Sequence, residues 1–498
     1  MKWVLAFALA LLADQKTIPP HPHALRFPAG TLHLPVAEGR RFQIPGGPTI
    51  YLAEDHTLPL VEITVAMPIG SFLDPPGMAG LSYLTGSQLR RAGSAHLSAD
   101  EFDERVDDLG ARLESMAGAT RSGASLSVPS WALDEGLALF FGMLSAPTFQ
   151  ADRVETARTN LLESMSRRNE DALEILQREW DWLMFGERHF SNRPITPVTL
   201  AAIDRQNLVD FHRRYWQPDT MILAVSGDFD AQEMLASLDR SFSDWPHADR
   251  GAEATDWVPP APQGAAPPGL YHYEADFPQA KVFLGHRLST LLDWDDPDRL
   301  VLEVIAEILG GSGAISRIAG RLRTAEGLVY RAAAEFDPGE LWPGSLRIFF
   351  ETQSTSVARA VELALEEIDR GRTSPVHPKE LEVAKQTLLA RLRLDFDTAE
   401  EIAGYFAQDE LLGRPHGYWQ DYLEGVGEVS LKAVTEAARV YLQPDEFVVL
   451  VVGRWAEISA DALPGKSTLE RLCGHRVIHL PARDPLTLQP VGIGEPIP

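Results

Sequence analysis

The stretch 215–227 reads YWQPDTMILAVSG, and the stretch 441–453 reads YLQPDEFVVLVVG. The tyrosine, the Gln-Pro-Asp and the closing glycine recur in the same register, from Tyr215 to Gly227 and from Tyr441 to Gly453. A turn with Pro and Asp, followed by a β-branched apolar run, is typical of a loop that leads into a buried strand. Because both stretches share this order, we predict that one fold unit is used twice.

Two further kinds of segment repeat upstream of these turns. An alternating apolar stretch, typical of a half-buried strand, comes first, and two helices with apolar faces follow it. The copies keep nearly the same spacing, with Leu133 equivalent to Val357 in the first helix and Ala157 to Ala384 in the second. The predicted segments are the strands 124–128 and 346–350, the helices 133–144 and 357–368, and the helices 147–162 and 375–389. Three pairs in one order favour an internal repeat over two unrelated α/β domains.

The repeat predicts the domain organisation. We expect an α+β fold of two homologous lobes, each a mixed, mainly antiparallel sheet covered by helices. The lobes are predicted at 30–250 and 270–464. Between them, 251–269 is rich in Pro, Gly and Ala and has no periodicity, which is typical of a semi-rigid linker. The tail 465–498 has no counterpart in the first half.

The composition is that of an ordinary globular chain with an acidic surface. Its 498 residues exceed one compact core, and 45% are hydrophobic and 23% charged. A formal charge of −26 repels phosphate backbones, so we expect no nucleic-acid partner. Cys473 is the only cysteine, which excludes an intramolecular disulfide and a cysteine-ligated zinc or iron–sulfur site.

The N-terminus favours export. Met1-Lys2 is followed by an apolar run at 3–13 and by polar residues at 14–16. This order is typical of a signal peptide, which we place at 1–14; an apolar start that packs on the fold is the alternative. The run is too short to span a bilayer, and no other stretch is long and apolar enough. We therefore expect a periplasmic or secreted protein with no membrane span.

Three short motifs carry a family resemblance. The sequence has HTLPLV at 56–61, Gly-Ser at 70–71 and Gly-Leu-Ser at 80–82. This order resembles the opening of the pitrilysin/insulinase metallopeptidases, in which such a strand leads into a helix that begins Gly-Leu-Ala. The resemblance extends over about 41–453. It implies half of a clamshell, because members have two such repeats per half, and some assemble the clamshell from a catalytic and a non-catalytic chain.

The helix that binds zinc in active members is altered here. It reads His-x-x-Glu-His there: two histidines on one face hold Zn²⁺, the glutamate is the general base, and a later glutamate is the third ligand. By the match, Tyr83 and Ser87 stand at the histidine positions, Gly86 at the glutamate and Ser164 at the third ligand, with Glu163 one residue off that face. Because these residues are not usual zinc ligands, the resemblance implies no zinc site in this chain.

The remaining histidines do not suggest another metal site. His475 and His479 have i, i+4 spacing, but the sequence CGHRVIHL predicts a strand, in which they would lie far apart. His21 and His23 flank a proline near the predicted mature N-terminus, where we expect solvated side chains. We interpret His56, which precedes a predicted buried strand, as structural.

The segment Gly310-Gly311-Ser312-Gly313 is rich in glycine. It lacks the Lys-Ser/Thr of a P-loop, so a nucleotide site is not indicated. The chain also lacks the Gly-x-Ser-x-Gly elbow of a serine hydrolase. This glycine-rich loop, with the residues after it, instead resembles the family segment Gly-Gly-x-x-Ser-Arg-Leu, which precedes a Leu-Arg-x-x-x-Gly-Leu-x-Tyr motif.

That second motif places two side chains. By the match its arginine is Arg323 and its tyrosine is Tyr330, a pair that faces the zinc and holds the substrate backbone in active members. An arginine fork and a phenol hydroxyl can bind a scissile carbonyl and stabilise the oxyanion. The alternative is that Arg323 pairs with Glu326 and that Tyr330 packs in a core.

The sequence leaves three functions open. We favour the non-catalytic subunit of a two-chain zinc metalloendopeptidase. This chain would have no cofactor of its own, and a catalytic partner would carry His-x-x-Glu-His and the zinc. It would close the chamber and lend Arg323 and Tyr330 to peptide substrates. The first alternative is a stand-alone inactive homologue that binds peptides or acts as a scaffold. The second is an active metalloprotease with unrecognised ligands.

Overall fold

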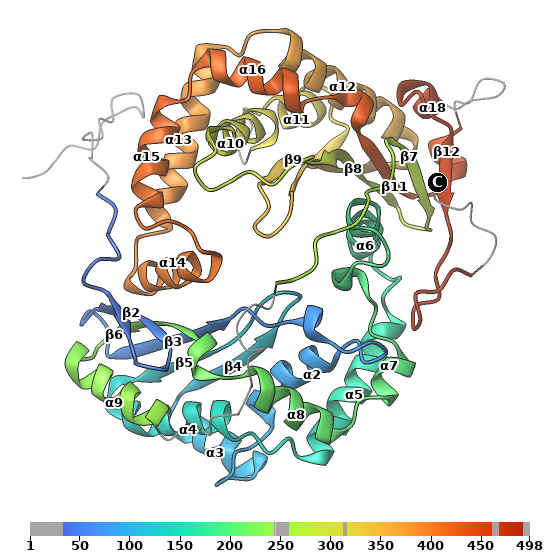
Figure 1. Cartoon of the computed structure of the whole chain (residues 1–498). Helices are drawn as coiled ribbons and strands as arrows, with labels where there is room; N and C mark the ends of the chain where they lie inside the picture. Colours follow the sequence, from blue (N-terminus) through green and yellow to red (C-terminus); the bar gives the residue numbers. More distant parts are fainter. Residues whose placement is uncertain (1–32, 244, 246–257, 312–315, 461–467, 492–498) are drawn as a thin grey trace, which may run out of the picture. The chain divides into compact units, whose positions relative to one another are not determined.

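The computed structural model describes residues 33–243, 245, 258–311, 316–460 and 468–491, and those from Pro35 onward belong to one structural unit (Figure 1). The signal peptide predicted at 1–14, His21 and His23, and Ser312 and Gly313 of the glycine-rich loop lie outside these residues. In the part of the chain that is described, we find no helix with the length and apolar character needed to cross a bilayer.

The first repeat forms a mixed sheet with the strand order β1-β2-β6-β3-β5-β4. β2 is parallel to β6, and the other neighbours are antiparallel. The strands are β1 (Arg41–Gln43), β2 (Thr49–Glu54), β3 (Leu60–Met67), β4 (Arg112–Ala117), β5 (Ser122–Pro129) and β6 (Ile222–Gly227). The helices are α2 (Leu81–Gln88), α3 (Ala99–Asp108), α4 (Leu133–Ser145), α5 (Ala151–Ser166), α6 (Ala172–Phe185), α7 (Pro197–Ala201), α8 (Arg205–Tyr215) and α9 (Ala231–Ser243).

The second repeat forms a sheet with the order β12-β7-β11-β8-β10-β9. β7 is parallel to both β11 and β12, and the other neighbours are antiparallel. The strands are β7 (Gly269–Glu274), β8 (Gln279–Arg287), β9 (Val329–Asp337), β10 (Ser345–Gln353), β11 (Val448–Gly453) and β12 (Val477–Leu480). The helices are α10 (Pro297–Gly310), α11 (Arg317–Ala319), α12 (Val357–Thr373), α13 (Pro378–Leu394), α14 (Ala399–Leu412), α15 (Tyr418–Glu428), α16 (Leu431–Tyr441), α17 (Trp455–Ile458) and α18 (Thr468–Leu472).

These sheets confirm the predicted α+β fold and its internal repeat. The two Gln-Pro-Asp motifs form short 3-10 turns that lead into β6 and β11, which are almost wholly buried. The predicted alternating strands lie within β5 and β10, and the predicted helices are α4, α5, α12 and α13. The core of the first sheet follows the alternation, because Ile63 and Leu126 are fully buried while Glu62 and Ser127 lie on the opposite face.

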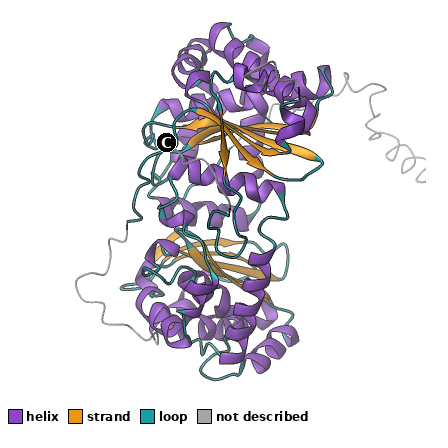
Figure 2. Ribbon diagram, turned by 90° about the vertical axis from the view of Figure 1, so that its right-hand side faces the viewer, coloured by secondary structure: helices purple, strands orange, loops and turns teal. Residues whose placement is uncertain are grey.

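The two repeats exchange one helix each, which the sequence did not predict. α6 of the first repeat packs on β8 and β11 of the second sheet, and α14 of the second repeat packs on β2 and β6 of the first (Figure 1). Figure 2 shows the two sheets with helices against them. α6 directly follows α5 in the first repeat and α14 directly follows α13 in the second, so they are equivalent members of the repeat. Ile175, Leu176 and Trp180 of α6 share a buried cluster with Phe283 and Leu450. Each sheet therefore has helices of both repeats on its faces.

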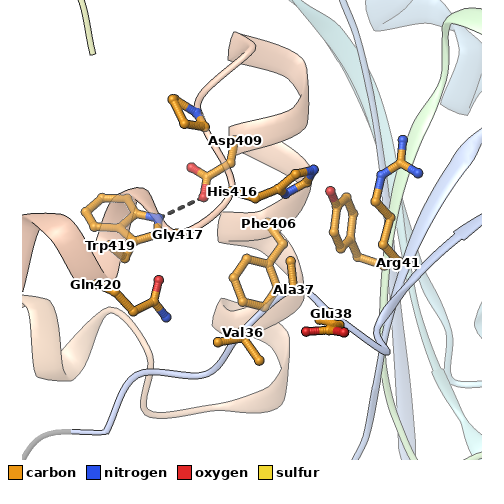
Figure 3. Close-up of a pocket in the computed structure, with 12 residues that line it drawn as sticks. Val36, Ala37, Glu38, Arg41, Phe406, Asp409, His416, Gly417, Trp419 and Gln420 are labelled. Carbon is orange, nitrogen blue, oxygen red and sulfur yellow. Dashed lines mark hydrogen bonds between the residues drawn. The ribbon is translucent and has the colours of Figure 1, made fainter. Parts of the chain in front are cut away.

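A polar contact fastens α14 to the first sheet. The Glu410 carboxylate accepts hydrogen bonds from Arg41 Nε at 3.0 Å and Nη2 at 2.8 Å, and from the Tyr51 hydroxyl at 2.7 Å. Beside this contact is a cavity of about 400 Å³, lined by the segment 36–38, Phe406 and Trp419 among others (Figure 3). Residues of the N-terminal segment and of the second repeat therefore line the same cavity.

Candidate functional site

α2 is the helix that the resemblance identifies with the zinc-binding helix. Gly80 precedes it in the left-handed region (φ 103°), where glycine is favoured. The buried Asp74 carboxylate accepts hydrogen bonds of 2.8 Å from the backbone N–H groups of Gly80 and Ser82. These bonds satisfy donors at the start of the helix and fix its entry. The helix expected after Gly-Leu-Ser is therefore present and firmly capped.

The position of the family's general base is closed by packing. A Cβ added at Gly86 would lie 2.6 Å from Cβ of Ala117 and 3.1 Å from the carbonyl oxygen of Met116, both on the edge strand β4. Carbon atoms in ordinary contact are about 3.5–4.0 Å apart. A glutamate at this position would require the helix or the strand to move.

The other positions offer only hydroxyl groups. Tyr83 is exposed, and the Ser87 hydroxyl lies 3.4 Å from the carbonyl oxygen of Leu84. Ser164 lies exposed on α5, which contacts α2, and donates to the carbonyl oxygen of Leu161 at 2.8 Å. A phenol and two alcohols do not match the nitrogen, thiolate and carboxylate donors that zinc prefers. The residues present at the family's zinc positions therefore do not fit the ion.

Two of the histidines discussed above, His56 and His479, have polar partners in the structure. His56 Nδ1 lies 2.7 Å from Oδ1 of Asp228, and the hydrogen bond to this carboxylate raises the pKa of the imidazole. His479 on β12 faces His272 on β7 with 3.0 Å between their Nδ1 atoms, and burial lowers the pKa of His272 to about 4. Among the described residues, no group of three or more His, Cys, Asp or Glu side chains is placed to hold a metal ion.

Arg323 and Tyr330 lie on either side of a turn at the edge of the second sheet. Arg323 belongs to a π-helical turn, η8 (Gly320–Ala325), and Tyr330 is the second residue of the edge strand β9. Leu322, next to Arg323, is fully buried, and its carbonyl oxygen accepts from the Leu328 N–H at 2.9 Å. This bond closes the turn between the two side chains. π-Helical turns are frequent at functional sites.

Both side chains reach solvent. Tyr330 is 84% exposed, so it does not pack in the core. Glu326, the acid nearest in sequence, lies 3.2 Å from Arg321 instead. Within the described residues, the exposed Arg323 side chain makes no hydrogen bond or ion pair. The arginine and the tyrosine are therefore both available to a ligand.

The described glycines of the glycine-rich loop serve packing. Gly310 ends α10, and a Cβ added there would lie 2.6 Å from Cβ of Ala334 on β9. A Cβ at Gly311 would collide with the Glu307 carboxylate. Gly310 thus allows α10 to approach the edge strand that carries Tyr330.

Comparison with known proteins identifies the family and the fold. The family "Insulinase (Peptidase family M16)" matches residues 49–191, and "Peptidase M16 inactive domain" matches 202–388. An uncharacterized zinc protease of Mycobacterium leprae is 23% identical over 419 residues, which are 84% of this chain and 92% of that protein. The zinc protease PqqE of Helicobacter pylori is 20% identical over 367 residues, 71% of this chain and 80% of that protein.

Solved structures share the fold. A peptidase M16 inactive domain from Pseudomonas fluorescens superposes with a TM-score of 0.72 at 21% identity, covering 83% of this chain and 98% of that one. The periplasmic protease PqqL of Escherichia coli gives a TM-score of 0.69 at 14% identity, covering 90% of this chain and 50% of that one. The two family matches together span more than half of the sequence, and the resemblance drawn from HTLPLV and the later motifs is confirmed. This chain belongs to the insulinase family of M16 peptidases.

Proposed function

We propose that this chain is the non-catalytic subunit of a two-chain zinc metalloendopeptidase. A separate M16 subunit would carry His-x-x-Glu-His and the zinc, and this chain would close the peptide chamber. The observation that carries the proposal is a contrast between its two candidate sites. The helix that should hold the metal is closed at Gly86, whereas Arg323 and Tyr330 are exposed to solvent.

The role of this pair is to hold the peptide. The guanidinium of Arg323 presents several N–H donors in a fixed fork, and the Tyr330 hydroxyl can donate one more. Donors aimed at a scissile carbonyl stabilise the negative charge that develops on its oxygen. The pair itself transfers no proton and contributes binding and charge stabilisation. The general base and the metal would come from the partner.

Edge strands support a way of binding peptide. β4 and β9 each end a sheet, so one side of each strand has backbone groups that no strand of the described sheet pairs. An extended peptide can add to such an edge by main-chain hydrogen bonds. Met116 on β4 is 65% exposed and would contact an added strand. This mode selects extended substrates with little dependence on sequence.

The proposal includes export of this chain from the cytoplasm. The segment 1–14 has the order of a signal peptide, which supports a periplasmic or secreted protein. A structural neighbour, PqqL of Escherichia coli, is described as a periplasmic protease. Export would place both subunits in one compartment with peptide substrates.

The test is reconstitution with a catalytic M16 subunit produced from the same organism. We expect the purified chain alone to contain no stoichiometric zinc and to leave a fluorogenic peptide intact, and we expect the mixture to cleave it. Arg323→Ala and Tyr330→Phe should each lower kcat/KM of the mixture by about 100-fold or more, the scale of one lost oxyanion donor. Arg393→Ala, on the exposed face of α13, is the matched control and should have no effect.

Two results decide against the subunit role. Stoichiometric zinc and cleavage by the lone chain would mean that it is an active protease with other ligands. Unchanged cleavage by the catalytic subunit with and without this chain would favour the second candidate, a stand-alone peptide-binding or scaffold protein. The exposure of Arg323 and Tyr330 serves that candidate too, because peptide could bind there without turnover.

A further inference from the structure

A second cavity lies beside the exchanged helix α6. It has a volume of about 490 Å³ and is bounded by Arg168 in the turn after α5, one face of α6, the loop 191–195 and Leu488 of the C-terminal tail. Three arginines, Arg168, Arg178 and Arg193, line it. In a chain with a formal charge of −26, three guanidinium groups around one cavity are an exception that calls for a physical explanation.

Two of these arginines have carbonyl partners. Arg168 Nη1 lies 3.5 Å from the carbonyl oxygens of Pro485 and Leu486, the limit of a hydrogen bond. Arg193 donates to the carbonyl oxygens of Ser71 at 2.9 Å and Asp74 at 3.3 Å. Within the described residues neither guanidinium has a carboxylate at ion-pairing distance. Burial and the nearby charge of Arg178 lower the pKa of Arg168, which means that its charge is poorly compensated.

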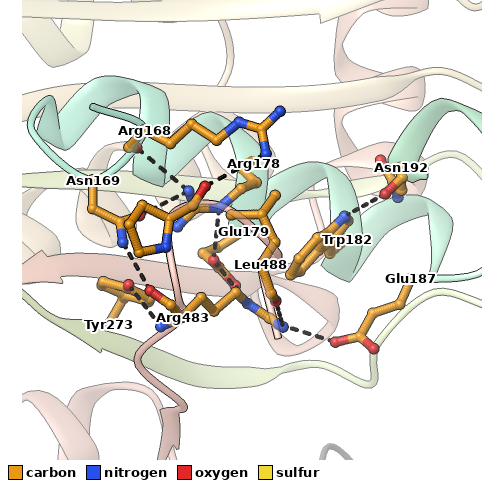
Figure 4. Close-up of polar contacts among 11 residues, drawn as sticks. Arg168, Asn169, Arg178, Glu179, Trp182, Glu187, Asn192, Tyr273, Arg483 and Leu488 are labelled. Atoms are coloured by element: carbon orange, nitrogen blue, oxygen red, sulfur yellow. Dashed lines mark hydrogen bonds and ion pairs between the residues drawn. The ribbon is translucent and has the colours of Figure 1, made fainter. Parts of the chain in front are cut away.

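The third arginine shares its acid partner. Arg178 Nε lies 3.1 Å from Glu179, whose carboxylate also binds Arg483 at 3.2 Å (Figure 4). Arg178 Nη1 donates to Asn169 Oδ1 at 3.1 Å, but Nη2 is buried without a partner among the described residues. A buried donor without an acceptor is destabilising.

The acids of the cavity limit the charge of its ligand. Glu174 and Asp181 also line the cavity, and Asp181 accepts from Gln177 at 2.8 Å. Because Arg178 is paired with Glu179, the guanidinium groups of Arg168 and Arg193 face the carboxylates of Glu174 and Asp181. Neutralisation of Asp181 leaves an excess of one positive charge, which suits a monoanion better than phosphate. Trp182 and Leu488 add apolar wall beside the polar groups. A carboxylate on a short apolar stem matches this lining.

We infer that this cavity binds a carboxylate of a peptide, either an acidic side chain or a free C-terminus, through Arg168 and Arg178. An arginine guanidinium can donate two parallel hydrogen bonds to one carboxylate. Arg193 supplies positive charge from the loop 191–195 while its N–H groups hold the segment that caps α2. The inference does not depend on a catalytic partner, because this chain alone forms the cavity.

The test uses labelled peptides and the purified full chain. Acetyl-Ala-Ala-Glu-Ala-Ala-amide is compared with its Gln counterpart, and pentaalanine with a free C-terminus is compared with its amide, by fluorescence anisotropy. We expect at least one carboxylate peptide to bind about tenfold more tightly than its neutral partner, and the two arms identify the source of the carboxylate. Because burial raises the pKa of Asp181 to about 6, the preference should grow from about pH 8 to about pH 5.5 as this acid is neutralised.

Variants locate the site. Arg168→Gln should remove the preference, and Arg393→Gln, the same change on α13 outside the cavity lining, should keep it. The wild-type comparison of Glu with Gln needs no variant, so a folding defect cannot hide the answer. Equal binding of all charged and neutral peptides would overturn the inference, as would a preference that survives in Arg168→Gln.

Discussion

The packing of α2 on β4 makes a quantitative prediction for Gly86→Ala. The new methyl group would lie 2.6 Å from Cβ of Ala117, 3.1 Å from the carbonyl oxygen of Met116 and 3.3 Å from the amide nitrogen of Ala117. Since carbon atoms in contact prefer about 3.5–4.0 Å, the helix and the strand must separate by roughly 1 Å. Such overpacking costs about 1–3 kcal/mol.

The helix itself would favour alanine. Replacing glycine by alanine inside a helix stabilises it by about 1 kcal/mol. The net effect of Gly86→Ala should therefore lie between no change and a loss of about 2 kcal/mol. Ala117→Gly removes the closest contact of the new methyl group. Gly86→Ala should therefore be more favourable by about 1–2 kcal/mol in the Ala117→Gly variant than in the wild type.

Four proteins test this prediction by urea unfolding: wild type, Gly86→Ala, Ala117→Gly and the double variant. The coupling free energy is read from midpoints at a common slope. If Gly86→Ala stabilised the chain by about 1 kcal/mol and the coupling were zero, α2 would not be seated on β4 and the argument for a closed base position would fail. Far-UV circular dichroism on each variant confirms that the helix content is unchanged.

Three further predictions concern stability. Glu410→Gln should cost about 1 kcal/mol at pH 7. Because the hydrogen bond from Arg41 holds the pKa of Glu410 below its usual value of 4.5, this loss should shrink as the pH falls below 4.5 and through the lowered pKa, as urea unfolding over a pH series from 7 into the acid range would show. Burial lowers the pKa of His272 from its ordinary value of 6.5 to about 4, so between pH 6.5 and about pH 4 the unfolded state binds more protons than the folded state. As the pH falls through that window, the free energy of unfolding should decrease by up to about 1.4 kcal/mol per pH unit. His272→Gln should flatten this slope, which thermal unfolding across the same pH range would measure. Arg483→Met leaves the buried Glu179 with one arginine fewer and should cost about 3 kcal/mol, which Arg483→Met/Glu179→Gln should partly restore in urea unfolding.

The repeat could be predicted because its signal is local. The Gln-Pro-Asp turns fix where β6 and β11 begin, and the apolar periods of α4 and α12 need no knowledge of neighbours. The exchange of α6 and α14 could not be predicted in this way. Each helix has a buried face, and periodicity states that a face is buried without stating which sheet buries it.

The tail shows the same limit. The sequence CGHRVIHL predicted a strand, and β12 confirms one at 477–480, with His475 just before it. β12 pairs with β7 at the edge of the second sheet, the position that β1 occupies beside β2 in the first. This pairing depends on contacts between residues far apart in the sequence. Such pairing leaves no trace in local composition.

Of the candidate sites, those marked by a linear motif could be predicted from the sequence, and the one assembled by the fold could not. Tyr83, Gly86 and Ser87 could be placed on a helix because a linear motif surrounds them. Arg168, Arg178 and Arg193 share a cavity but no motif, because they come from the turn after α5, from α6 and from a loop. Only the fold brings them together, so inspection of the sequence passed over them.

The closed helix of the first repeat has a counterpart in the second. Gly86 of α2 rests on Ala117 of the edge strand β4, and Gly310 of α10 rests on Ala334 of the edge strand β9. In each pair, an added Cβ would lie 2.6 Å from the alanine Cβ, and the interval between the two glycines equals the interval between the first residues of α4 and α12. The second repeat contains most of the segment that matches the family's inactive domain. The first repeat therefore has the same contact between helix and edge strand as the second, and this packing leaves no room for a side chain at the position where active relatives are expected to have the general base.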